Sequence, residues 1–81
     1  MTKKGIRNPF RNAEMRRVFD DYVALFYDGK LRNPNGTQSR GGSNRAMFWR
    51  GYDGEPNLLA PKGSTNYACY RAGQAVKKKE T

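Results

Sequence analysis

The chain has 81 residues, of which 16 are Lys or Arg and 7 are Asp or Glu, so its formal net charge is +9. A chain of this length forms one domain with a small core, and we expect folding to bury only about 60% of its unfolded surface. The excess of positive charge favours a polyanionic partner, nucleic acid above all, although solubility alone would also account for it.

The composition also excludes several classes of site. The chain has one cysteine and no histidine, which rules out an internal disulfide and argues against a zinc site. Cys69 has no histidine base to activate it, so we expect a small core residue. No apolar stretch approaches membrane-spanning length, and no signal peptide follows the first lysines. We therefore expect a cytoplasmic protein without membrane, metal or cofactor.

Residues 1–11 are predicted to form a basic arm. Gly5 and Asn8-Pro9 within it disfavour a helix. Arg7 and Arg11 carry the arm's charge, and Phe10 is a candidate for pinning it to the core.

A first helix is predicted over residues 13–28, within a segment that covers 12–29. Asn12 is a good N-terminal cap, and Gly29 is expected to end the helix. Between them apolar residues recur at spacings of three and four, which is the strongest helix signal in the chain. This stripe, expected to face the core, consists of Met15, Val18, Phe19, Tyr22, Val23 and Phe26.

Two loop–helix units are predicted to follow, over residues 30–51 and 52–76. Their helices should span about 43–51 and 65–76, with side-chain caps at Ser43-Asn44 and Thr65-Asn66. The basic tail, 77–81, begins with three lysines that either stabilise the negative end of the last helix or fray.

The chain aligns with itself at an offset of 22 residues, which indicates a repeated structural unit. The aligned sets are Ala24, Ala46 and Ala68; Phe26, Phe48 and Tyr70; and Gly29, Gly51 and Gly73. In each unit the aromatic residue and the glycine share a helix face, where the glycine either lets another backbone approach or stops the helix. We expect Gly29 to be a stop and the last helix to continue through Gly73. The prediction is an all-α fold: a small irregular bundle of one longer and two shorter helices with long loops.

No group of residues predicts catalysis, so we expect that the protein is not an enzyme. Asp20-Asp21 lie beside arginines on a helix and are interpreted as a solvated face. Gly41-Gly42 lie among arginines, but the lysine and hydroxyl of a phosphate-binding Walker loop are missing.

Basic and aromatic residues are interleaved around the second predicted helix. Guanidinium groups bind phosphate in a bidentate fork, and aromatic rings stack on unpaired bases. Phe48 should face inward, whereas Trp49 either lies at the surface beside Arg45 and Tyr52 or packs under the loops. The predicted nucleic-acid-binding set is Arg40, Arg45, Trp49, Arg50, Tyr52, Lys62, Arg71, Lys77, Lys78, Lys79, Arg7 and Arg11.

Part of this set resembles the ribosome modulation factor family. Asn33-Pro34 precedes Arg45-x-x-Phe48-x-x-Gly51-Tyr52, and the family has an Asn-Pro-aromatic turn followed by Arg-x-x-Trp-x-x-Gly-Trp. Asn35 stands where the family has an aromatic residue, and Phe48 and Tyr52 replace tryptophans. The resemblance covers about a quarter of the chain. It implies an all-helical fold and a place on ribosomal RNA, where such proteins silence the ribosome.

Two functions stay open on the sequence alone. The first is a small RNA-binding, ribosome-associated protein, a monomer or weak dimer, that acts by occluding a site. The second is a phage-type inhibitor that binds an acidic surface of a host protein, with Trp49 and Tyr52 as interface anchors. Non-specific packaging of duplex DNA is a weaker third option, suggested by the basic ends.

Overall fold

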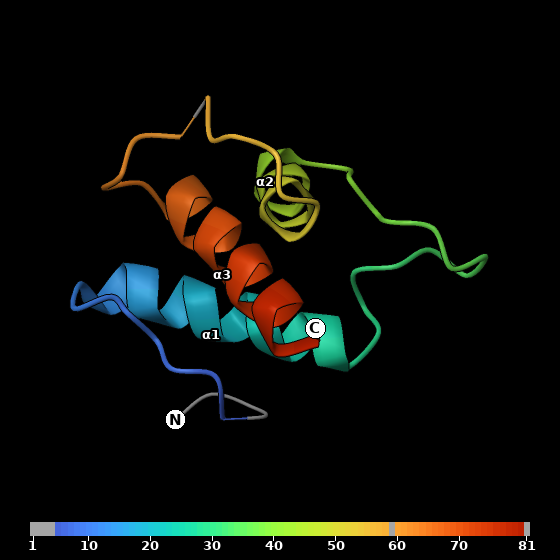
Figure 1. Ribbon diagram of the computed structural model, residues 1–81, viewed down its shortest axis with the longest axis horizontal. Coiled ribbons are helices and arrows are strands. Elements are labelled where there is room, and N and C mark those ends of the chain that lie inside the picture. Colours follow the sequence, from blue (N-terminus) through green and yellow to red (C-terminus); the bar gives the residue numbers. More distant parts are fainter. Residues whose placement is uncertain (1–4, 59, 81) are drawn as a thin grey trace.

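Three α-helices joined by long loops make up the described part of the chain (Figure 1). The computed structural model describes residues 5–58 and 60–80, with α1 at Ala13–Tyr27, α2 at Ser43–Tyr52 and α3 at Thr65–Glu80. The described residues contain no strand, only an isolated antiparallel bridge between Arg32 and Gln38. The all-α prediction is therefore confirmed.

The first helix begins and ends close to where the sequence predicts. Asn12 caps it, because its Oδ1 accepts a hydrogen bond of 3.1 Å from the Met15 N–H. Asp28 closes the C-terminal end, and Gly29 follows with φ of 76°, a left-handed conformation that glycine adopts without strain. The apolar stripe faces inward as expected, with Met15, Phe19 and Val23 buried.

The predicted caps of the other two helices are wrong. Gly42 precedes α2 with φ of 113°, and the Ser43-Asn44 pair lies inside the helix, where no side chain caps the first amides. The Thr65-Asn66 pair likewise lies inside α3, and the hydroxyl of Ser64 accepts a bond of 3.2 Å from the Tyr67 N–H instead. In both cases the first residue of the pair is already helical, so each helix begins one residue earlier than a cap at that residue would allow.

The third helix is longer than predicted, since it continues from residue 76 through Lys77, Lys78 and Lys79 to Glu80. The three lysines occupy its last turn, where positive charge stabilises the C-terminal end of the helix dipole. The predicted basic tail is therefore helical over 77–80, and residue 81 lies outside the described residues.

Helices α2 and α3 pack with their backbones in contact. A Cβ atom on Gly51 would lie 2.0 Å from the carbonyl oxygen of Tyr70, and one on Gly73 would lie 1.9 Å from the carbonyl oxygen of Phe48. The two contacts are reciprocal, because each glycine meets the backbone of the aromatic residue in the other helix that the repeat aligns with its own helix's aromatic residue. Only glycine allows such an approach at these two points.

The first unit does not use its glycine in this way. Gly29 lies beyond the end of α1 with positive φ, and nothing lies within 4 Å of the position its Cβ would take. The 22-residue repeat over three units is therefore not confirmed, although the expected roles of Gly29 as a stop and Gly73 as an interior residue are both correct.

The N-terminal segment lies against α1 and α3. The side-chain amide of Asn8 donates to the Arg16 carbonyl oxygen at 2.9 Å and to a carboxylate oxygen of Asp20 at 2.8 Å. The ring of Phe10 meets those of Phe19 and Tyr67 edge-on, at centroid distances of 5.9 and 6.0 Å. The prediction that Phe10 pins the arm is thus correct for residues 5–11, while residues 1–4 of the arm lie outside the described part.

A core of apolar side chains is shared by all three helices and the loop after α1. Its largest fully buried members are Trp49, Phe19, Phe48, Leu31, Val23, Val76 and Cys69. The inward positions predicted for Phe48 and Cys69 are therefore confirmed. Within the described ranges, no helix is long and apolar enough to cross a bilayer.

Candidate polyanion-binding groove

A groove of about 590 Å³ runs between the N-terminal segment and α3. We call it the basic groove. Its lining is Ile6, Arg7 and Pro9 from the N-terminal segment, Phe19 from α1, and Arg71, Gln74, Ala75, Lys78 and Lys79 from α3. Four of these side chains are cationic, and none of the described residues that line the groove is a carboxylate.

The α3 wall follows from the helical repeat. Arg71, Gln74, Ala75 and Lys78 stand at spacings of three and four, so they share one face of the helix. The opposite face of α3, which includes Cys69, Gly73 and Val76, is buried in the core. One helix therefore holds the bundle together and presents the groove wall at the same time.

The second wall is fixed by the anchoring of the N-terminal segment. Ile6 is buried, and two residues later the Asn8 amide is bonded to α1. Arg7 lies between these two fixed points, so its backbone is held opposite α3. The groove is therefore preformed rather than assembled from a free arm.

Arg71 is oriented by its own helix. Its Nη1 donates to the Tyr67 hydroxyl at 3.2 Å, and its guanidinium carbon lies 5.9 Å from the centroid of that ring. The side chain is half-buried. A guanidinium has five N–H donors in a rigid fork, so one bond to Tyr67 fixes its direction and still leaves donors for an anion.

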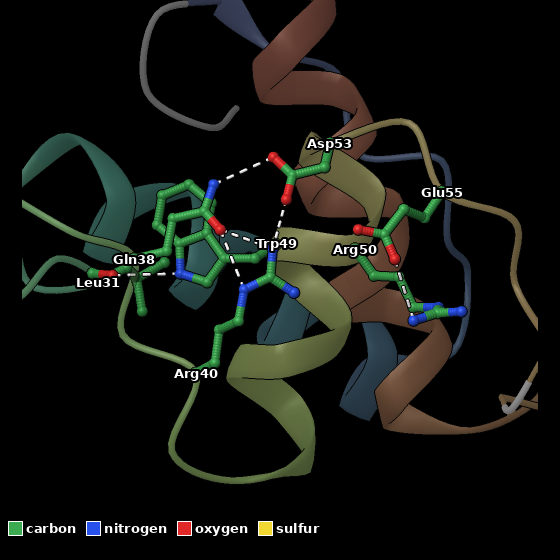
Figure 2. Close-up of polar contacts among 7 residues, drawn as sticks. All are labelled: Leu31, Gln38, Arg40, Trp49, Arg50, Asp53 and Glu55. Carbon is green, nitrogen blue, oxygen red and sulfur yellow. Dashed lines mark hydrogen bonds and ion pairs between the residues drawn. The ribbon is translucent and has the colours of Figure 1, made fainter.

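Arg40 and Arg50 lie elsewhere and are engaged with carboxylates (Figure 2). Arg40 pairs with Asp53 and also donates to Gln38. Arg50 pairs with Glu55 at 3.1 Å, and its Nε donates to the Pro56 carbonyl oxygen at 3.1 Å. These carboxylates offset the two charges locally, so neither arginine extends the positive field of the basic groove.

The predicted surface role of Trp49 is wrong. The side chain is fully buried, and its Nε1–H donates to the Leu31 carbonyl oxygen at 3.2 Å, as Figure 2 shows. The guanidinium carbon of Arg32 lies 4.8 Å from the centroid of the ring. The loop after α1 folds over this face of α2, which makes the alternative interpretation, a core residue under the loops, the correct one. The indole cannot stack on a base.

The other predicted binding residues do not line the groove. Tyr52 is half-buried, with the Lys77 ammonium nitrogen 5.0 Å from its ring centroid. Arg45 is half-buried on α2, and Arg11 and Lys62 are exposed. Of the twelve residues predicted, the structure brings Arg7, Arg71, Lys78 and Lys79 together.

Sequence reasoning missed the neutral members of the groove. Gln74 and Ala75 could have been found from their spacing to Arg71 and Lys78 on a continuous helix. Ile6, in contrast, is far from α3 in sequence, and no local signal connects the two.

Cys69 takes no part in this site. It is a free, fully buried cysteine, and burial raises the pKa of its thiol to about 12. The reactive thiolate is therefore scarce at neutral pH. The described residues also contain no cluster of three or more potential metal-ligating Cys, Asp or Glu side chains.

Comparison of the chain with protein-family models, with curated proteins and with solved structures finds no match. Of the residues that resemble ribosome modulation factors, Phe48 is fully buried and Gly51 forms the contact between α2 and α3. Phe48 and Gly51 therefore serve packing in this structure.

Proposed function

We propose that the protein binds RNA through its phosphate backbone, with the basic groove as the principal contact. The observation that carries this proposal is the convergence of Arg7, Arg71, Lys78 and Lys79 on one groove, in which none of the described lining residues is a carboxylate. Arginine binds phosphate in a bidentate fork and lysine binds it as a point charge, so the set suits a chain of phosphates.

Ribosomal RNA is the partner we propose, because the Arg-x-x-aromatic-x-x-Gly-aromatic motif resembles that of ribosome-associated modulators. The protein would act by occlusion, its docked body covering a site on the RNA. Charge would bring it to the target, and the fixed walls of the groove would hold a phosphate in place. The buried position of Trp49 removes the stacking platform that the sequence suggested, which makes phosphate contacts the larger share of the binding energy.

The alternative of an inhibitor that binds an acidic host protein has lost one of its two anchors, since Trp49 is buried. A pull-down from nuclease-treated lysate separates the two proposals. We expect the captured material to disappear with the RNA. A protein partner that stays bound at fixed stoichiometry after nuclease treatment would overturn the RNA proposal.

The test of the groove itself uses Arg71→Ala and Lys78→Ala, with Arg17→Ala as the control. Arg17 is exposed on α1 and does not line the groove, so its loss changes the net charge equally. Binding to a labelled single-stranded ribosomal RNA fragment is measured by fluorescence anisotropy at several salt concentrations. We expect Arg71→Ala to cost about 1–3 kcal/mol of binding free energy and to lower the salt slope by about one. Equal losses in all three variants would show that only net charge matters.

A further inference from the structure

We infer that the basic groove holds one unpaired nucleotide, with the base against its apolar floor and the flanking phosphates on its cations. This inference rests on the proposed RNA binding. It specifies which part of the RNA enters the groove. It predicts a preference for single strands over duplex that charge alone does not explain.

The lining combines two kinds of surface that a bare phosphate would not need. Pro9 and Ala75 contribute accessible carbon surface, the buried side chains of Ile6 and Phe19 lie beneath it, and the cations stand around it. A volume of about 590 Å³ falls within the range of small-molecule sites, about 300–1,000 Å³. Phosphates alone would leave the apolar part wet, whereas the face of a base would cover it and gain the free energy of apolar burial.

The order of residues along α3 matches the order of groups in a nucleotide. Arg71 and Lys78 stand seven residues apart, about 10 Å along the helix axis. Gln74 and Ala75 lie between them on the same face. A nucleotide within a strand likewise has a phosphate on each side of its base. The Gln74 amide offers two donors and an acceptor, which is the chemistry that reads a base edge.

The bound nucleotide must not be base-paired, because its base has to lie on the apolar floor of the groove. In a duplex both faces of a base are stacked and its Watson–Crick edge is paired, so the base has no face to lay on Pro9 or Ala75. The N-terminal wall is held by the Asn8 bonds to Arg16 and Asp20, so the floor exists before the ligand arrives.

The test fills the groove without changing charge. Ala75→Leu adds carbon to the half-buried groove position, and Ala13→Leu makes the same change at an exposed position outside the groove. Gln74→Ala is the second groove variant, since Gln74 is exposed and its loss leaves the core intact. Circular dichroism melts establish that each variant folds. The probes are a short single-stranded RNA, its duplex, and adenosine 3′,5′-bisphosphate with inorganic phosphate as its control.

We expect Ala75→Leu to weaken binding of the single strand and the bisphosphate about tenfold, with duplex and inorganic phosphate unchanged. Gln74→Ala should weaken the same two ligands by a smaller factor, and Ala13→Leu should match the parent protein. If both groove variants bind the single strand like the parent while Arg71→Ala weakens it, the nucleotide inference is wrong and the RNA proposal stands. If no RNA binds in a salt-dependent way, the RNA proposal itself fails. Tighter binding to phosphatidylglycerol vesicles than to RNA, abolished by Ala75→Leu, would identify an anionic lipid and overturn the inference.

Discussion

The side chain of Trp49 links α2 to the loop after α1. Its ring packs at right angles to those of Phe48 and Tyr52, at centroid distances of 5.2 and 5.1 Å. Its N–H reaches the backbone of Leu31 across the loop after α1. A buried indole normally satisfies its N–H, and here the Leu31 carbonyl oxygen does so. The residue that looked most like a base-stacking platform is therefore a structural link.

Replacing Trp49 by Phe should lower the free energy of unfolding by about 1–3 kcal/mol, because the buried hydrogen bond from the indole to Leu31 is lost and the smaller ring leaves a void. The Leu31 carbonyl oxygen keeps its other bond, from the Ser39 N–H at 2.9 Å. Urea unfolding followed by circular dichroism measures the change. Leu58→Ala is the control, since Leu58 is 72% exposed and its loss should cost less than about 0.5 kcal/mol.

The parent protein gives a second check on the same residue. Trp49 is the chain's one tryptophan, so its emission should neither shift nor be quenched when RNA is added. A folded Trp49→Phe variant with parental stability and reduced RNA affinity would contradict the buried role.

At the scale of elements, α3 determines both the packing and the site. Its small residues let α2 come close, with Gly73 against the Phe48 carbonyl oxygen, while its polar face forms one wall of the basic groove. A shift of α3 would therefore change the core and the groove together. The reciprocal position of Gly51 against Tyr70 leaves no room for a side chain at either glycine where α2 and α3 cross.

Alanine at Gly51 or Gly73 should destabilise the protein by about 3 kcal/mol or more, because the new Cβ would overlap a backbone carbonyl oxygen and the helices would have to separate. Thermal or urea unfolding measures the loss. Gly41→Ala is the matched control, because the φ of Gly41 is not positive and nothing lies within 4 Å of the added Cβ. The free energy of unfolding of this variant should stay within about 0.5 kcal/mol of that of the parent protein. Equal effects at all three positions would refute the close crossing.

At the scale of the whole molecule, a net charge of +9 on 81 residues lowers the stability of the folded state and favours the binding of a polyanion. Self-repulsion of like charges destabilises the folded state, and the pairs Arg40–Asp53 and Arg50–Glu55 offset part of it. Those pairs are partly exposed, so each contributes little to stability. The remaining cations supply the field that attracts a polyanion.

Salt should therefore have opposite effects on folding and on binding. Between about 50 and 200 mM KCl the melting temperature should rise, because screening weakens the self-repulsion. Over the same range the affinity for single-stranded RNA should fall about 50-fold if four phosphates are neutralised. Differential scanning calorimetry and anisotropy titrations in the same buffers measure both. A melting temperature that falls with salt would mean that the surface ion pairs outweigh the repulsion.

The predictable part of this protein is what depends on residues close in sequence. The apolar stripe of α1, its Asn12 cap and its Gly29 stop each act within a turn or two of helix, so spacing alone locates them. The same holds for the all-α class and for the inward position of Phe48. Local rules still misplaced the caps of α2 and α3, where competing residues stand side by side.

What depends on contacts between distant segments was decided by the tertiary structure alone. The helical repeat correctly put Trp49 on a different side of α2 from Phe48, but only the folded loop shows that this side is covered. Likewise the charges of Arg7 and Arg71 are evident from composition, while their meeting in one groove requires the N-terminal segment to lie against α3. Sequence fixes periodicity and charge because these are properties of neighbouring residues. The burial of a side chain and the meeting of distant charges depend on which segments pack together, so only the tertiary structure determines them.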